Sequence, residues 1–296
     1  MAERLGYRPW TGERRRPRLG FWPITRSALG IVLRRRIFWF FLVLALLDFF
    51  LHSGVIYLMA QVEGATGFRL PPGFREKFLF TGTGDAYKNF IFFQSTVVMV
   101  MLALAGSFLV GDDFRARAIP FYLSKPVGKG GYFLGKLGAA GILTLSVTLV
   151  PTAILFIEYG AFTESIDYYL QNGRIFGAIV GYSALVSLVE SVLVLGVAAV
   201  MKGTAPIAMT WGGVFVLLPA VSELVGEAYR WRGLSGDWAW RLLDVWRDMG
   251  AVATLLFGGK DETTDRWPWA AAALAVVVVL SLIAFARKVR AVEVVR

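Results

Sequence analysis

Long apolar runs alternate with shorter polar stretches along the whole chain. Six of these runs are long enough to cross a bilayer as a helix, because about 20 residues at ~1.5 Å each span the roughly 30 Å hydrocarbon core. The pattern therefore predicts an all-α integral membrane protein with six transmembrane helices. The predicted spans cover residues 37–60, 90–110, 137–157, 175–200, 207–224 and 267–286.

The residues before the first apolar run divide into two parts. Residues 1–21 hold two prolines and many arginines, which predicts an extended basic tail. Further along, Arg26 and the arginines at 34–36 surround apolar residues, a pattern typical of a short helix in the membrane interface. A plain basic flank is the alternative. The apolar residues that recur there at helical spacing are Ile24, Ala28, Ile31 and Val32.

The polar stretch before the last apolar run, residues 225–266, is too long to be a simple turn. Within it, apolar residues recur every three or four positions and charged residues occupy the other face. This pattern predicts one external amphipathic helix, and the nearby tryptophans fit the aromatic belt of a membrane surface. The apolar positions are Ala239, Leu242, Leu243, Trp246, Met249, Ala253 and Leu256.

Lysine and arginine are distributed unevenly between the polar stretches. The loop at residues 111–136 and the N-terminal tail are rich in them, whereas 156–174 has three acidic residues and a single basic one. Because basic loops stay in the cytoplasm, we expect both termini and 111–136 inside, with 61–89, 156–174 and 225–266 outside. The predicted domains are a cytoplasmic tail at 1–21, a membrane domain at 22–290 and a cytoplasmic end at 291–296.

The composition agrees with a membrane protein. Hydrophobic residues make up 56% of the chain and charged residues only 18%, against about 25% in soluble domains, and the mean hydropathy is +0.60. The net charge of +10 comes from residues beside apolar runs, where they contact anionic headgroups. The expected partners are therefore membrane lipids, and no nucleic acid. The absence of cysteine excludes disulfides, thiolate zinc sites and cysteine nucleophiles.

Residues 130–136 match the G-x-x-x-x-G-K core of a phosphate-binding loop. The next residue is Leu137, where the motif needs Ser or Thr, and no buried strand precedes it. We therefore predict no nucleotide site there. The chain has one histidine, which argues against a Ser–His–carboxylate set. The sequence predicts no catalytic residue, no bound cofactor and no metal site in this chain.

Three ionisable residues fall inside predicted spans. Asp48 and His52 lie one helical turn apart in the first, and Glu190 lies in the middle of the fourth. Such residues usually face the bundle interior or a wet path, because charge in hydrocarbon is costly. Two ligands are fewer than a catalytic metal site generally needs, so a hydrogen-bonded polar pair is favoured for Asp48 and His52. For Glu190 we expect a place along a transport route or at an interface.

The 111–136 loop carries a recognisable pattern. It has an acidic start at Asp112–Asp113, the sequence Leu123-Ser124-Lys125-Pro126 at its centre, and Tyr132-Phe133-Leu134-Gly135-Lys136 at its end. With six spans and a basic interfacial helix, the chain resembles the permease subunits of ABC type-2 transporters. In that family this loop often has an acidic start, an l-l-s-x-P centre and a y-x-x-G-K end. The resemblance covers roughly residues 22–290.

The resemblance implies half of a transporter, in the cytoplasmic membrane of a bacterium or archaeon. A second permease copy, identical or closely related, would complete an export pathway. Separate ABC ATPase subunits would bind the ATP and magnesium, so this chain would not itself be an enzyme. The loop would dock on the ATPase through apolar anchors and rim charges. The implied docking residues are Asp112, Asp113, Arg115, Arg117, Pro120, Phe121, Tyr122, Leu123, Lys125 and Pro126.

Other classes of membrane protein remain as alternatives. A carrier that works without an ATPase should have matched broken helices in two halves, and the pattern has none. An intramembrane enzyme should have a convergent polar set at depth, for which Asp48, His52 and Glu190 are few. A structural or regulatory membrane subunit could use the same docking loop without moving cargo.

Overall fold

The computed structural model describes residues 20–66, 80–115, 118–119, 122, 128–162, 166–201, 203–234, 236–259 and 266–289. Nearly all of these residues are helical, and none of them forms a strand. The helices are α1 (Trp22–Leu33), α2 (Arg36–Thr66), α4 (Gly84–Gly106), η1 (Ser107–Gly111), α5 (Asp112–Arg115), α7 (Gly128–Phe162), α8 (Ile166–Gln171), α9 (Gly173–Val200), α10 (Thr204–Gly212), η2 (Gly213–Leu217), α11 (Leu218–Trp231), α12 (Asp237–Arg241), α13 (Val245–Phe257) and α14 (Trp267–Lys288).

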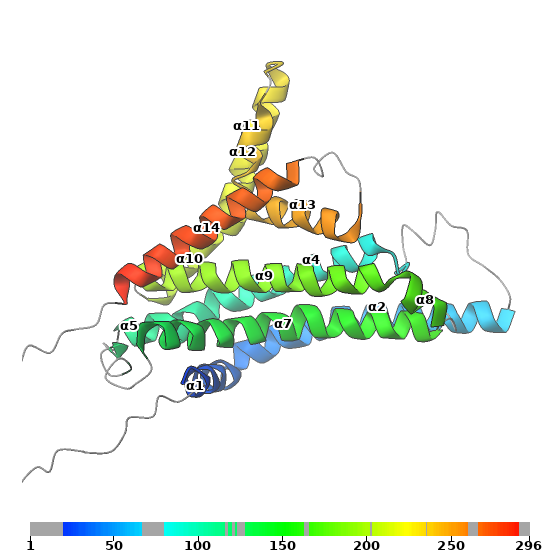
Figure 1. Ribbon diagram of the computed structural model, residues 1–296, viewed down its shortest axis with the longest axis horizontal. Coiled ribbons are helices and arrows are strands. Elements are labelled where there is room, and N and C mark those ends of the chain that lie inside the picture. Colours follow the sequence, from blue (N-terminus) through cyan, green and yellow to red (C-terminus); the bar gives the residue numbers. More distant parts are fainter. Residues whose placement is uncertain are drawn as a thin grey trace, which may run out of the picture.

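Six helical segments in the described part of the chain are long and apolar enough to cross a membrane. They are α2, α4 with η1, α7, α9, the run from α10 through η2 to α11, and α14. The predicted all-α membrane fold is therefore confirmed, and the protein is a multi-pass membrane protein. In Figure 1, α2, α4, α7 and α9 run together along the long axis, whereas α11 leaves the bundle with α12 beside it.

Two membrane helices begin earlier than the hydrophobic pattern predicts. The second starts at Gly84 instead of residue 90, and the third starts at Gly128 instead of residue 137. Hydropathy marks only the part of a helix that lies in hydrocarbon, whereas backbone hydrogen bonding continues into the headgroup region. As a result, the end of the predicted 111–136 loop forms the first turns of α7.

Helix α9 is the centre of the bundle and packs against α4, α7, α13 and α14. Small residues let these helices approach closely, as is usual inside membranes. A Cβ added at Gly196 would lie 2.7 Å from the Cβ of Ser281 on α14, and one at Gly106 of α4 would lie 2.6 Å from Val194. These glycines therefore set the helix spacing around α9.

The fifth predicted span is a long helix with a widened turn at η2. Pro219 has no N–H, so it cannot donate to the carbonyl of Phe215 four residues earlier. Trp246 of α13 donates its Nε1 to that carbonyl instead, at 3.2 Å. The proline thus produces a helix irregularity that α13 stabilises from outside.

The predicted amphipathic helix through residues 239–256 is wrong as a single element. The structure has two helices there, α12 and α13, separated by a turn. Asp244 ends the turn in an extended conformation, and its side chain accepts from the backbone N–H of Arg247 at 3.1 Å. Aspartate at such a position caps a new helix, and this local signal outweighs the continuing apolar period.

The helix predicted before the first span is present as α1. Ile24, Ala28 and Val32 are buried against the bundle, whereas Ile31 faces outward and is 39% exposed. The backbone then turns at residues 34–35, and α2 begins at Arg36. The arginines of that turn therefore lie at the corner between α1 and the first membrane helix.

Candidate docking segment and buried polar residues

The 111–136 segment joins α4 and η1 to α7. The structure describes its two ends, together with Ala118, Ile119 and Tyr122. Asp112 and Asp113 begin the short helix α5, in which Arg115 is the last residue. The side chain of Arg115 and the predicted docking residues Arg117, Pro120, Phe121, Leu123, Lys125 and Pro126 lie outside the described residues.

A buried ion pair closes the base of this segment. Lys136 Nζ lies 2.6 Å from Asp113 Oδ2, and the Tyr132 hydroxyl donates to the same oxygen at 2.8 Å. The Lys136 side chain is only 2% exposed and that of Asp113 only 14%. A buried charge is tolerated when it is paired and hydrogen-bonded. Asp113 therefore points into the segment and holds its two ends together.

Aromatic rings surround this ion pair. Lys136 Nζ lies 5.6 Å from the Tyr132 ring centroid and 5.9 Å from that of Tyr122, within cation–π range. The Tyr132 ring also stacks on Phe285 of α14, with 6.1 Å between centroids. Burial, and then the Asp113 carboxylate, raise the pKa of Tyr122, so this phenol stays neutral. Ile119 is buried and Tyr122 is partly buried, so Ile119 and Tyr122 support the segment from inside.

Helix α1 rests on the first turns of α7. Thr25 of α1 donates its hydroxyl to the carbonyl of Gly135 at 2.9 Å. A Cβ at Gly135 would lie 2.7 Å from the Cβ of Ile24 and 2.9 Å from the carbonyl oxygen of Phe21. Only glycine allows this approach. Neighbouring residues Gly135 and Lys136 thus bind α1 and the segment base, respectively.

These contacts gather at one end of the molecule. Figure 1 shows α1, α5, the start of α7 and the end of α14 at the same end, with α8 at the opposite end. The basic residues at this end include the arginines at 34–36, which follow α1, together with Lys129 of α7 and with Arg287 and Lys288 of α14. The opposite end carries Glu158 and Asp167 near the ends of α7 and α8.

The sequence pattern did not predict that Tyr132 and Lys136 both contact the Asp113 carboxylate, although both belong to the motif at the end of the segment. The two residues are four apart in a helix, so their side chains lie on one face. The sequence feature that could have indicated their partner was the acidic pair Asp112–Asp113 at the start of the preceding helix, α5. Residues 130–136, which resemble a phosphate-binding loop, are all helical in α7. They do not have the open-loop shape that cradles phosphate.

Asp48 and His52 form a polar pair on α2, where this helix contacts α4. His52 Nδ1 lies 2.9 Å from the Asp48 carbonyl oxygen and 3.4 Å from its Oδ1. Gln94 of α4 donates its Nε2 to Asp48 Oδ2 at 3.2 Å and to the Ala45 carbonyl at 3.0 Å. The His52 ring packs edge-on against Phe90. Among the described residues no group of three ligands could hold a metal ion.

Glu190 is fully buried in the middle of α9, and neither carboxyl oxygen has a hydrogen-bond partner. Its position on the helix is given by two contacts. Ser187, three residues earlier, donates to the Gly141 carbonyl of α7 at 3.4 Å. Val194, four residues later, lies against Gly106 of α4. Because residues three and four apart share a helix face, Glu190 faces the seam between α4 and α7.

The surroundings of Glu190 are polar, but none of the described residues donates a hydrogen bond to it. On α9, the hydroxyls of Tyr182, Ser183 and Ser191 are buried without a partner. On α7, Thr144 and Thr148 donate to carbonyls of their own helix, four residues earlier. An unpaired carboxyl at such depth is costly and usually has a function. Glu190 is therefore the strongest intramembrane candidate.

No protein-family model matches the chain, and no curated protein matches it significantly. The residues and contacts described above therefore carry the functional assignment.

Proposed function

We propose that this chain is the permease subunit of an ABC transporter of the type-2 group. Two permease copies form an export pathway, and a separate ATPase subunit docks on the 111–136 segment of each. The observation that carries the proposal is the closed base of that segment. Asp113, Tyr132 and Lys136 fasten its two ends together, so the segment can transmit force to the helices.

Three helices connect the segment to the membrane domain. Asp113 closely follows α4 and η1 in the chain, Lys136 lies in α7, and Gly135 of α7 accepts a hydrogen bond from α1. Movement of a docked ATPase would therefore displace three helices as one body, a common form of switching. The π-helical turn η1 lies where the segment joins α4, and such turns often mark functional hinges.

The described residues also narrow the assignment of the docking surface. Asp113, Ile119 and Tyr122 support the segment from inside. The apolar anchor is therefore assigned to Phe121 and Leu123. The basic residues Arg115, Arg117 and Lys125 serve at the rim, where they suit a partner groove lined with carboxylates.

The second permease copy fits the outer face of the helix formed by α10, η2 and α11. This face carries exposed apolar residues: Met209 is 76% exposed, Val216 63% and Leu224 69%. The helix contributes little to its own bundle and diverges from it in Figure 1. We propose that both termini lie in the cytoplasm, because the positive-inside rule favours that side for the basic end of the molecule. The membrane would be the cytoplasmic membrane of a bacterium or archaeon, as the family resemblance implies.

Co-expression tests the proposal. The chain is produced with the ABC ATPase encoded by an adjacent reading frame, and only the ATPase is tagged. We expect the two proteins to purify together in equal amounts and to hydrolyse ATP at a rate that depends on the permease. A permease that leaves the ATPase during purification and does not change its hydrolysis would overturn the proposal.

Glu190 supports a second candidate function, a carrier driven by an ion gradient without an ATPase. Its buried, unpaired carboxyl is the kind of group that relays protons in carriers. The two functions are separated in liposomes that contain the purified chain alone. A carrier takes up an ion or proton there under an imposed gradient, whereas an isolated ABC permease does not.

A further inference from the structure

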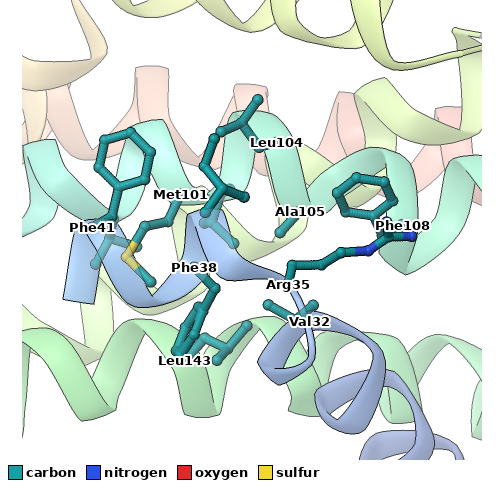
Figure 2. Close-up of a pocket in the computed structure, with 12 residues that line it drawn as sticks. Val32, Arg35, Phe38, Phe41, Met101, Leu104, Ala105, Phe108 and Leu143 are labelled. Carbon is teal, nitrogen blue, oxygen red and sulfur yellow. The ribbon is translucent and has the colours of Figure 1, made fainter. Parts of the chain in front are cut away.

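A narrow apolar slot lies at the corner where α1 turns into α2, beside α4 and η1. Figure 2 shows its walls, which come from α1, α2, α4, η1 and α7. The empty space between the walls is about 420 Å³ with the open mouth included. Its main lining residues are Phe38, Phe41, Met101, Ala105 and Leu143.

Among the described residues that line the slot, Arg35 is the only polar one. Its guanidinium carbon lies 4.2 Å from the centroid of the Phe108 ring, which holds the positive charge beside the slot. Arg34 and Arg36 flank it, and all three side chains are exposed. None of the three forms an ion pair with a carboxylate among the described residues. Among the described residues, the positive charge at this corner therefore has no carboxylate counterion.

Trp39 indicates the depth of this corner in the membrane. Its Nε1 donates to the Leu33 carbonyl at 2.8 Å, and its ring is 52% exposed. Tryptophan prefers the headgroup level, where its polar edge and apolar body are both accommodated. Beyond it, Phe40 and Val43 are more than 60% exposed, at 66% and 61%, on the lipid-facing side of α2. The arginines thus lie at headgroup level, beside acyl chains.

We propose that this slot is a binding site for one anionic phospholipid. An acyl chain occupies the slot, and the phosphate group lies on Arg35 between Arg34 and Arg36. The apolar space suits a hydrocarbon chain, and among the described lining residues only Arg35 offers hydrogen bonds to a polar group. The unpaired positive charges select an anionic headgroup over a zwitterionic one. The bound lipid joins α1 to α4, and this inference does not depend on the transport function.

A titration of the purified chain in a non-ionic detergent tests the site. Native mass spectrometry counts bound lipid, and thermal unfolding follows the stabilisation. We expect saturable binding of one phosphatidylglycerol and weaker binding of phosphatidylcholine with the same acyl chains. Inorganic phosphate alone should not stabilise the protein, because it has no chain to fill the slot.

Two variants and a matched control locate the lipid. Arg35→Gln should weaken phosphatidylglycerol binding by about fivefold, the effect of one basic residue near a membrane surface. Arg287→Gln removes the same charge from an exposed position at the same end, outside the slot, and should change binding by less than about twofold. Ala105→Leu fills the slot and should abolish the saturable component.

Three results would overturn the proposal. Equal binding of the two lipids would remove the selectivity for charge. Equal weakening by Arg35→Gln and Arg287→Gln would show diffuse surface attraction in place of a site. Unchanged binding by Ala105→Leu would show that no chain enters the slot. If Ala105→Leu does not fold, Leu104→Phe narrows the same slot from a partly exposed position, and the same criterion applies.

Discussion

At the residue scale, the ion pair between Asp113 and Lys136 is the contact expected to matter most for the stability of the 111–136 segment. It is buried, it is supported by Tyr132, and it joins two stretches of chain that belong to different membrane helices. Removing one member of such a pair leaves an uncompensated buried charge, whereas removing both does not. This asymmetry makes the role of the pair measurable.

The variant Lys136→Met should destabilise the protein by about 3 kcal/mol, because Asp113 then stays buried with only one donor. The double variant with Asp113→Asn should recover more than half of that loss. Chemical unfolding in detergent, followed for the parent, both single variants and the double variant, measures the coupling. If the losses of unfolding free energy in the two single variants simply add in the double variant, Asp113 and Lys136 are not coupled.

Glu190 differs from that pair because it has no partner. Replacing a buried unpaired carboxyl by an apolar group of similar size should not destabilise the protein, and we expect Glu190→Leu to be about 1 kcal/mol more stable. We also expect Glu190→Gln to fold normally and to alter ATP turnover or transport by the complex. Thermal unfolding and activity are measured on the same samples. A Glu190→Leu protein that is equally stable and fully active would show that the carboxyl has no role.

We expect Asp248 to make the stability of the protein depend on pH. It lies in α13, only 3% exposed. Burial, and then the Asp244 carboxylate, raise its pKa to about 8 against the opposing effect of Arg247. Because the folded state holds this proton from about pH 4 to pH 8 and the unfolded state releases it, stability falls as pH rises through that window. Asp248→Asn should flatten the fall in unfolding temperature between pH 5 and 8.5, and an unchanged slope would exclude Asp248 as its source.

At the element scale, the contact of α1 with α7 connects α1 to the 111–136 segment. The contact depends on the missing side chain at Gly135, whose Cβ would meet both Ile24 and the backbone of Phe21. Backbone atoms cannot move aside cheaply, so a methyl group there must displace α1. A displaced α1 could no longer follow the segment.

We therefore expect Gly135→Ala to lower the unfolding temperature and to reduce permease-dependent ATP hydrolysis. Gly130→Ala is the matched control, because it lies in the same helix with nothing within 4 Å of the added Cβ. Alanine favours helix over glycine by up to about 1 kcal/mol, so the control should be as stable as the parent or more so. Similar unfolding temperatures and ATP hydrolysis rates for the two variants would contradict a role of Gly135 in holding α1 on α7.

The elements themselves were largely predictable, because apolar length and helical period are strong signals in a membrane protein. The six spans and α1 follow from these signals alone. The break before α13 does not, since a single cap at Asp244 overrides a continuing apolar pattern. The early start of α7 also escapes hydropathy, because residues 128–136 are helical without being uniformly apolar.

The candidate site was less predictable, because its key contacts join residues distant in sequence. The Thr25 hydroxyl reaches Gly135 across 110 positions, and Gln94 reaches Asp48 across 46. Sequence period places each residue on a helix face but does not say which helix lies opposite. Asp113 and Tyr122, expected at the docking surface, therefore needed the structure to show that they contact the segment base.

At the scale of the whole molecule, an even number of spans brings the two ends of the membrane domain and the 111–136 segment together. Figure 1 shows α1, α5 and the end of α14 at one end of the bundle. The basic residues of these elements lie at the same end. A soluble ATPase that docked there would contact the segment and α1 from one side, and the helices would carry the displacement across the membrane.

The most direct test of the proposed function is the affinity of this chain for an ABC ATPase when the proposed apolar anchor is removed. Truncating a central anchor typically costs about 2 kcal/mol, so Phe121→Ala should weaken binding by about 30-fold. Leu170→Ala is the control, because it removes a comparable side chain, 79% exposed, from α8 at the opposite end. Binding of the adjacent-frame ATPase to the permease in lipid nanodiscs gives the dissociation constants. We predict a loss of about 30-fold for Phe121→Ala and none for Leu170→Ala. A Phe121→Ala variant that binds the ATPase within twofold of the parent would contradict the proposed docking role.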